Sequence, residues 1–196
     1  MFPIEDHSAE NRAEIFDIDD ARVKDRLIFG IAQGGRAELE LLYRQVSPAV
    51  YAYALSILKN SSAAEDVMQD AFVSIAQNAA GYRSQGKPMA WIMTITRNLA
   101  LMRLQKKESR NLPIDDYTEL ACGRDMYSET DNRLMLKTAL GALSEEERQI
   151  VTLHGVAGIK HREIAELLDM PLSTVLTKYK RALEKMKKTM GGDDGD

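Results

Sequence analysis

Apolar residues recur at steps of three and four along most of the sequence, and no stretch alternates apolar and polar residues as a half-buried strand does. Two consecutive clusters in the first half show this spacing clearly, Leu39 to Val46 and Val50 to Ile57. A step of three or four places side chains on one face of an α-helix, whereas a strand needs a step of two. The spacing therefore predicts an all-α protein.

Turn and capping residues divide the helical pattern into separate helices. Gly34-Gly35 is expected to separate the first helix from the second. Ser62 and Glu65 have the spacing of a capping box, which predicts that the third helix begins at Ser62. This helix is expected to end near Gly81, and a fourth is expected to begin near Pro88, after the polar loop GYRSQGKP.

The helical pattern fails in one internal stretch, where Pro113, Gly123 and acidic residues replace any regular apolar stripe. Such a composition predicts a flexible linker between two small helical domains. A chain of 196 residues is long enough for both. The sequence thus divides into an acidic extension expected to be disordered, a helical domain, the linker, a second helical domain and an acidic tail, at residues 1–20, 21–107, 108–130, 131–190 and 191–196.

Several classes of site are excluded by what the sequence lacks. Cys122 is the only cysteine, so the chain can form neither an internal disulfide nor a site with two thiolate ligands. The histidines, His7, His154 and His161, have no neighbours at metal-ligand spacing, and we expect no metal. The first twenty residues are acidic and contain no long apolar run, so we expect a cytoplasmic protein that inserts into no membrane.

Enzymatic activity is also not expected. The sequence shows no set of nucleophile, base and acid, no glycine-rich loop for phosphate and no cluster of metal ligands. We therefore expect neither catalysis nor a cofactor.

Residues 144–188 have the pattern of a helix-turn-helix. Ser144 and Glu147 form a second capping-box pattern, ahead of an apolar helix. A short amphipathic helix, KHREIAELL, follows, and Asp169-Met170-Pro171 predicts the turn into the last helix. Ser173 is expected to cap that last helix.

The last helix is expected to have one buried and one exposed face. The buried stripe consists of residues at helical steps, namely Val175, Tyr179, Ala182, Leu183 and Met186. The opposite face carries hydroxyl and basic groups from Thr174, Thr177, Lys178 and Arg181. The net charge of −4 does not argue against a nucleic-acid partner, because basic residues collect in this helix. The pattern favours binding in the major groove of DNA over the alternative of a solvated basic surface.

Four segments together resemble the extracytoplasmic-function sigma factors of bacterial RNA polymerase, members of the sigma-70 family. They are AEDVMQDAF, AWIMTITRNLA, LSEEERQIV and HREIAELLDMPLSTVLTKYKRAL. The resemblance extends from about residue 22 to residue 188 and keeps the order of the segments. It implies that the first domain is similar to sigma region two, that the second is similar to sigma region four, and that the protein is a transcription initiation factor.

The resemblance implies partners for three groups of residues. Recognition of the minus-thirty-five element is implied for Ser173, Thr174, Thr177, Lys178 and Arg181. Recognition of the minus-ten element and DNA melting are implied for Tyr82, Arg83, Lys87, Trp91, Arg97 and Asn98. Binding of core RNA polymerase is implied for Asp66, Gln69 and Asp70. The resemblance also implies an anti-sigma factor as an inhibitor, beside polymerase and promoter DNA.

The second of these groups has the chemistry that strand separation needs. An unstacked base requires an aromatic or apolar surface, polar groups for its edge and cations for its backbone. Tyr82 and Trp91 offer rings, Arg83 and Lys87 offer charge. A core position remains the alternative for Trp91.

The last helix departs from the family at a few positions. Ser173 stands where the family often has Gly, Leu176 where it often has a basic residue, and Thr177-Lys178 where it often has Ser-Arg. Lysine lacks the planar fork with which arginine binds guanine. The resemblance therefore does not indicate which promoter sequence is preferred.

Two other functions remain open. A dimeric helix-turn-helix regulator that acts without core polymerase would bind palindromic DNA on its own. An adaptor that only mimics a sigma factor, to bind its inhibitor, would need no basic recognition face.

Overall fold

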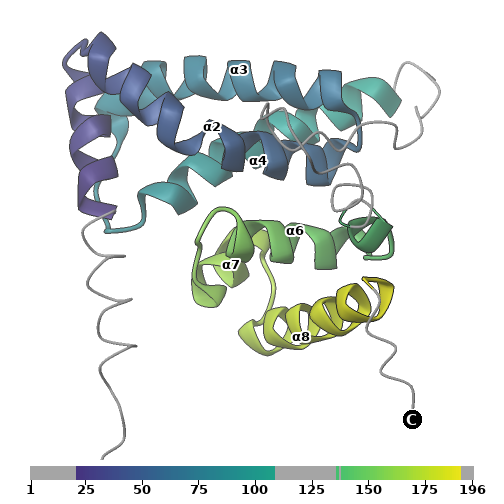
Figure 1. Ribbon diagram of the computed structural model, residues 1–196. Helices are drawn as coiled ribbons and strands as arrows, with labels where there is room; N and C mark the ends of the chain where they lie inside the picture. The colour runs from purple at the N-terminus through teal and green to yellow at the C-terminus, as the bar shows by residue number, and fades with distance from the viewer. Residues whose placement is uncertain (1–20, 109–135, 137, 191–196) are drawn as a thin grey trace, which may run out of the picture.

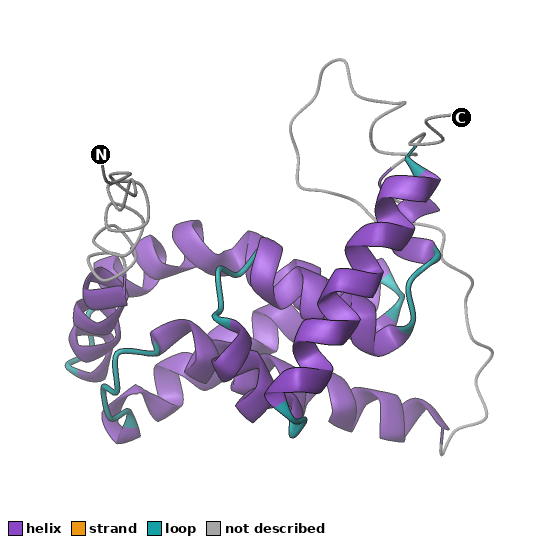
Figure 2. Cartoon of the chain, turned by 90° about the horizontal axis from the view of Figure 1, so that it is seen from below, coloured by secondary structure: helices purple, strands orange, loops and turns teal. Residues whose placement is uncertain are grey.

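The computed structural model describes residues 21–108, 136 and 138–190, and all regular structure in these residues is helical (Figure 2). Residues 21–32, here called the leading helix, precede α2 (Arg36–Leu58), α3 (Ser61–Asn78), the 3₁₀ turn η1 (Ala79–Gly81), α4 (Pro88–Glu108), α6 (Glu145–Gly155), α7 (His161–Leu168) and α8 (Leu172–Thr189). The all-α prediction is confirmed. The acidic extension, nearly all of the expected linker and the acidic tail lie outside the described residues.

The first half of the chain is a bundle in which α2, α3 and α4 contact one another (Figure 1). The central helix α2 buries Leu42, Val46, Val50 and Tyr53, at steps of four, four and three that keep them on one face. The predicted break at Gly34-Gly35 is confirmed, and Gly34 has a φ of 86° that other residues rarely adopt. None of the described helices is long and apolar enough to cross a membrane.

Capping residues set the helix starts, and two of the three predicted caps are wrong. Ser144 caps α6 as predicted, with both bonds of the capping box to Glu147 present. The helix α3, however, begins one residue earlier than Ser62, and its cap is Asn60, whose side chain accepts from the Ala63 amide at 2.8 Å. Asparagine is at least as strong a cap as serine, and Asn60 has the extended backbone that a cap needs.

The second incorrect cap is that of α8. Its N-cap is Pro171, whose carbonyl accepts from the amides of Thr174 and Val175. No side chain caps this helix, and Ser173 lies inside its first turn. Because the fixed φ of proline already suits a helix start, the cap lies two residues before the serine and the helix begins at Leu172.

The second half of the chain has the predicted helix-turn-helix. Asp169 ends α7 in the left-handed region, at φ 53°, and the chain turns there into α8. The buried residues of the two helices are Ile164, Ala165, Leu168, Val175 and Ala182. Leu183 departs from the predicted stripe because it is exposed. Its position on α8 lies beside the buried stripe rather than on it.

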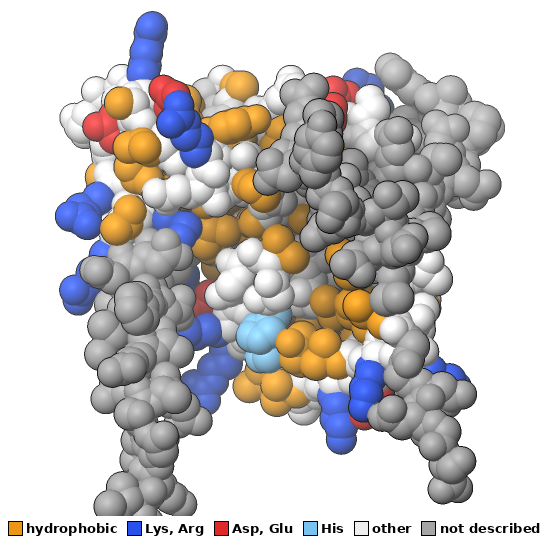
Figure 3. All heavy atoms as spheres, in the orientation of Figure 1, with side chains coloured by type: hydrophobic (Ala, Val, Ile, Leu, Met, Phe, Trp, Pro, Cys, Tyr) orange, Lys and Arg blue, Asp and Glu red, His pale blue; other side chains and the backbone are white. Residues whose placement is uncertain are grey.

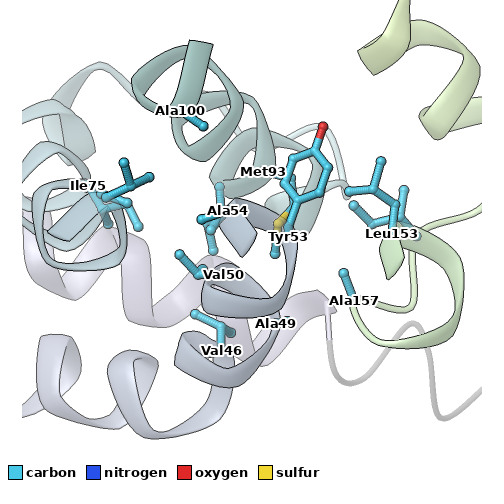
Figure 4. Packing of buried hydrophobic residues seen from close by; sticks show 14 of the residues in the cluster. Val46, Ala49, Val50, Tyr53, Ala54, Ile75, Met93, Ala100, Leu153 and Ala157 are labelled. Carbon is cyan, nitrogen blue, oxygen red and sulfur yellow. The ribbon is translucent and has the colours of Figure 1, made fainter. Parts of the chain in front are cut away.

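The two halves pack directly against each other, α6 against α2 and α7 against α4 (Figure 1). Buried apolar residues of both halves form one continuous cluster, in which Leu153 of α6 lies beside Tyr53 of α2 (Figure 4). Arg148 of α6 is only 4% exposed. Its guanidinium donates to the carbonyl oxygens of Leu140 and Leu143, and also to that of Ser56 in the last turn of α2, at 3.3 Å. A cation therefore binds the negative end of α2 across the boundary between the halves.

Candidate nucleic-acid interface

The exposed face of α8 carries most of the polar groups that the resemblance assigned to the minus-thirty-five element. Ser173, Thr177 and Arg181 are exposed, at steps of four that place them in one row, and Thr174 is half-buried beside them. The Thr177 hydroxyl donates to the Ser173 carbonyl oxygen at 2.8 Å. Lys and Arg side chains gather along the lower edge of the molecule in Figure 3, where Figure 1 shows α8. The helix thus presents a polar and basic row to solvent.

The N-terminus of α8 can itself favour an anion. Backbone amides at a helix start carry partial positive charge, which a capping side chain partly neutralises. Pro171 supplies no such side chain. A phosphate at this end would therefore meet the helix dipole and the hydroxyl of Ser173 together.

Lys178 differs from the rest of this group because its charged group pairs with a side chain of another helix. Its ammonium lies 2.6 Å from the carboxylate of Glu146 in the first turn of α6, and its side chain is half-buried. Lys185, two turns further along α8, binds Glu147 in the same way at 2.7 Å. These two pairs attach α8 to the start of α6. Any contact of Lys178 with DNA must therefore compete with Glu146.

Glu147 is an unusual carboxylate, because it is buried and still charged. Burial by itself would raise its pKa, but hydrogen bonds from Lys185 and from the Ser144 amide, together with the charge of Lys185, outweigh burial and lower that pKa. Glu147 completes the capping box of α6 and holds Lys185 at once. Glu147 therefore holds α8 against α6. The helices α6, α7 and α8 are called the recognition unit below.

Three aromatic rings, from two histidines and a tyrosine, pack together at the joint of the helix-turn-helix, a contact that helical spacing does not predict. The His154 and His161 ring centroids are 4.1 Å apart, and the Tyr179 ring lies 4.9 and 4.7 Å from them. The Nδ1–H of His154 donates to the Ile159 carbonyl oxygen at 3.0 Å, whereas the buried Nε2 of His161 has no hydrogen-bond partner. Burial, and next to it the charge of His154, lowers the pKa of His161. The cluster joins the end of α6, the start of α7 and the middle of α8.

The group assigned to the minus-ten element lies on the loop 82–87 and on α4. Arg83 and Asn98 are exposed, whereas Arg97 and Trp91 are half-buried. Tyr82 is only 4% exposed, and its ring packs on that of Trp91 with centroids 4.7 Å apart. Burial, followed by the hydrogen bond from its hydroxyl to Asp25, raises the pKa of Tyr82. In this conformation the ring of Trp91 is the more accessible of the two.

One residue of this group also touches the recognition unit. The ammonium of Lys87 lies 3.0 Å from the carboxylate of Glu166 in α7. The pair connects the loop 82–87 to the helix that precedes α8. An ion pair therefore joins the minus-ten group to the helix next to α8, which carries the minus-thirty-five group.

The third group lies on α3, away from the recognition unit. Asp66, Gln69 and Asp70 are exposed, opposite the buried Val67 and Ala71, as the spacing predicts. The Asp66 carboxylate pairs with Arg103 of α4. Gln69 and Asp70 extend the acidic and polar face by one turn.

The chain is similar to known proteins over most of its length. The family model for sigma-70 region 2 matches residues 42–110, and the model for sigma-70, region 4 matches residues 133–186. An "ECF RNA polymerase sigma factor SigK" from Mycolicibacterium vanbaalenii is 22% identical over 174 residues, which cover 85% of this chain and 89% of that protein. The protein of the same name from Mycobacterium tuberculosis is 22% identical over 172 residues, which cover 83% of this chain and 91% of that one.

Two solved structures have a similar fold. The sigma factor RpoE from Bartonella quintana, in complex with the anti-sigma factor NepR, has a TM-score of 0.64 and 23% sequence identity, and the match covers 79% of this chain and 97% of that one. CnrH, in complex with the cytosolic domain of CnrY, has a TM-score of 0.61 and 20% identity, with 88% and 99% covered. The arrangement of helices seen here is thus similar to that of two proteins whose structures were solved in complex with partners.

Proposed function

The chain belongs to the extracytoplasmic-function group of the sigma-70 family, and from this we propose that it directs core RNA polymerase to promoters by reading two DNA elements. The observation that carries the proposal is the presence, in order along one chain, of both sigma regions with a polar exposed surface on each. Polymerase performs the chemistry, and this protein, acting in the cytoplasm, supplies recognition.

Recognition of the upstream, minus-thirty-five element belongs to residues 131–190 in this proposal. The row of Ser173, Thr177 and Arg181 on α8 fits the major groove, which admits one α-helix. Thr174 and Lys178 flank the row, and the uncapped start of α8 receives a phosphate. Lys178 reaches DNA after it leaves Glu146.

Recognition of the downstream, minus-ten element belongs to residues 21–107. Arg83 and Lys87 neutralise the backbone of the separated strand, and the exposed amide of Asn98 on α4 binds a base edge. Arg97 lies one residue before Asn98 and adds charge on the same helix. Trp91 offers a partly exposed ring, and the buried Tyr82 supports it from behind.

Protein partners are proposed for the remaining face and for the regulation of the chain. Asp66, Gln69 and Asp70 on α3 dock on core polymerase, with Asp66 held in place by Arg103. Both similar structures contain an anti-sigma factor or a partner's cytosolic domain. We therefore assign an anti-sigma factor to this chain as its inhibitor.

Run-off transcription with purified core polymerase on a random promoter library tests the proposal directly. The expected result is RNA that begins at defined positions and a pair of enriched DNA motifs at fixed spacing. Absence of any defined start site overturns the proposal. Binding of palindromic DNA by the protein alone, without polymerase, would instead identify a dimeric helix-turn-helix regulator.

Two substitutions separate the roles of the halves. Lys178→Ala is expected to weaken use of the upstream element and its salt dependence, and Asn98→Ala is expected to impair opening at the downstream element. Templates that lack one element or the other provide the comparison. Equal activity of both variants on every template would refute the assignment of these residues.

A further inference from the structure

The loop 82–87 is held in place by side chains that lie far from it in the sequence. Its flanking backbone hydrogen bonds, from the Tyr82 amide to Ala79 and from the Trp91 amide to Lys87, lie at its two ends. Between them the loop depends on side chains. Lys87 at its end pairs with Glu166, and its first half is bound by Asp25, which lies 57 residues before Tyr82, on the leading helix.

Both carboxylate oxygens of Asp25 accept hydrogen bonds from the loop. The Tyr82 hydroxyl donates to Oδ1 at 2.5 Å, and the Ser84 hydroxyl donates to Oδ2 at 2.6 Å. Hydrogen bonds to an ionised carboxylate are short and roughly twice as strong as neutral ones. Asp25 is half-buried, so these bonds are partly shielded from water.

The two bonds lie on either side of Arg83. Because Tyr82 and Ser84 are both bound to Asp25, the backbone conformation of Arg83 between them is restrained. The side chain of Arg83 is exposed to solvent. Its guanidinium donates to the Tyr82 carbonyl oxygen at 3.3 Å, which further limits its range. The position of one exposed cation thus depends on a carboxylate that itself never needs to touch DNA.

The same carboxylate also holds the aromatic stack. Tyr82 lies between Phe29 of the leading helix, with ring centroids 6.0 Å apart, and Trp91 of α4, at 4.7 Å. The hydroxyl bond to Asp25 prevents the Tyr82 ring from sliding along this stack. Release of that bond would alter the surroundings of the Trp91 ring, which belongs to the only tryptophan of the chain.

We propose that Asp25 is a positioning residue for capture of the separated DNA strand, acting through Tyr82 and Ser84 on Arg83 and Trp91. This inference rests on the proposed function, because it assumes that the loop 82–87 binds the downstream element. Asp25 lies outside residues 42–110, the segment that the sigma-70 region 2 model matches, so the family comparison assigns it no role.

The test uses the full-length chain bound to core polymerase and a single-stranded oligonucleotide of the downstream element, selected in the transcription experiment. Asp25→Ala is expected to lower affinity for this oligonucleotide about tenfold, the combined effect of losing both hydrogen bonds at about threefold each. Affinity for upstream duplex DNA and for polymerase should be unchanged. Trp91 fluorescence of the free protein should shift in position or intensity. Glu40→Ala, which removes an exposed carboxylate from α2, is the matched control and should change none of these quantities.

Further variants cover the case in which Asp25→Ala does not fold. Tyr82→Phe and Ser84→Ala each remove one of the two bonds and should each lower oligonucleotide affinity about threefold, whereas Asp25→Asn should fall between wild type and Asp25→Ala. A lower melting temperature with unchanged oligonucleotide affinity would give Asp25 a purely structural role and overturn the inference. Wild-type protein that fails to start transcription would overturn the proposed function instead.

Discussion

Lys178 is the residue at which the internal contacts of the protein and its proposed contact with DNA compete most directly. Glu146→Gln should raise the affinity for upstream duplex DNA about threefold, because an ion pair of this exposure is worth up to ~1 kcal/mol and a neutral amide releases the ammonium. The slope of log affinity against log salt concentration should become steeper by about one, because one more counterion is released on binding. Titrations of labelled duplex at several salt concentrations measure both.

The control for this prediction lies one residue away. Glu145→Gln makes the same change of charge in the same first turn of α6, but Glu145 accepts from Gln149 and not from Lys178. It should leave DNA affinity nearly unchanged. Equal gains in the two variants would mean that general charge, and not the pair with Lys178, controls binding.

His161 should make the stability of the protein depend on pH near neutrality. Above pH 6.5, its ordinary pKa, both folded and unfolded states hold a neutral imidazole. As the pH falls below 6.5 the unfolded state takes up a proton first, because burial beside His154 lowers the pKa in the folded state. The free energy of unfolding should therefore fall, with the loss complete once the pH is below the folded pKa. His161→Phe keeps a ring against Tyr179 and should remove this part of the pH dependence.

Melting temperatures at pH 7.5 and pH 5.5 measure the effect. The difference between the two temperatures should be smaller in His161→Phe than in the wild type. Tyr179→Phe retains both histidines and the ring contacts, and should keep the wild-type difference. An unchanged difference in His161→Phe would show that other groups titrate in this range.

At the scale of the helix, two neighbouring residues at the start of α3, Asn60 and Ser62, should differ in their effect on stability. Asn60→Ala should lower the free energy of unfolding by about 1 kcal/mol, because it leaves the Ala63 amide without its acceptor. Ser62→Ala should change it by less than about 0.5 kcal/mol, because that hydroxyl caps nothing. Urea titrations give both values. A larger loss from Ser62→Ala than from Asn60→Ala would restore the cap that the sequence pattern predicted.

The helices could be predicted from the sequence. The cap of α3 and the burial of Leu183 could not, because several neighbouring residues of similar chemistry compete for each position. The steps of three and four gave the helices, and the glycine pair gave the first break, because both depend on local backbone geometry. Asn60 and Ser62 both suit a cap, and only tertiary packing decides between them. Leu183 has the spacing of a buried stripe, but the position of the neighbouring helices leaves it exposed.

The candidate site was predictable to the same extent. The exposed rows on α3 and α8 follow from helical spacing alone, since each is opposite a buried stripe. The contacts of the loop 82–87 do not follow from spacing, because Asp25 and Tyr82, or Lys87 and Glu166, meet only through the fold. No local pattern marks contacts between residues 57 and 79 positions apart.

At the scale of the whole molecule, the two halves that are proposed to read separate DNA elements are packed together. The contact includes an apolar cluster, the Arg148 bond to Ser56 and the Lys87 pair with Glu166. A cavity of about 120 Å³ also lies between the halves, and Lys24, Lys87 and Lys160 line it from both sides. Reading two separated elements requires these contacts to break. Polymerase and DNA must therefore bind an open arrangement, in which the halves are apart, more tightly than the closed arrangement, in which they are packed together.

Ala157 offers a way to open the halves without changing either DNA-binding row. It lines this cavity and is 8% exposed, whereas the adjacent Val156 is 56% exposed. Ala157→Arg places a long side chain in a cavity lined by three lysines and Glu163, and its size and charge should separate the halves, whereas Val156→Arg makes the same change in solvent and should not. Energy transfer between dyes on Gln77 of α3 and Glu184 of α8 should fall only in Ala157→Arg, while circular dichroism shows unchanged helix content.

With core polymerase at saturation, transcription by Ala157→Arg should stay within about twofold of wild type, because the bound protein is already open. Unchanged energy transfer, or a transcription defect in a variant that has opened, would show that the closed packing is also the active arrangement.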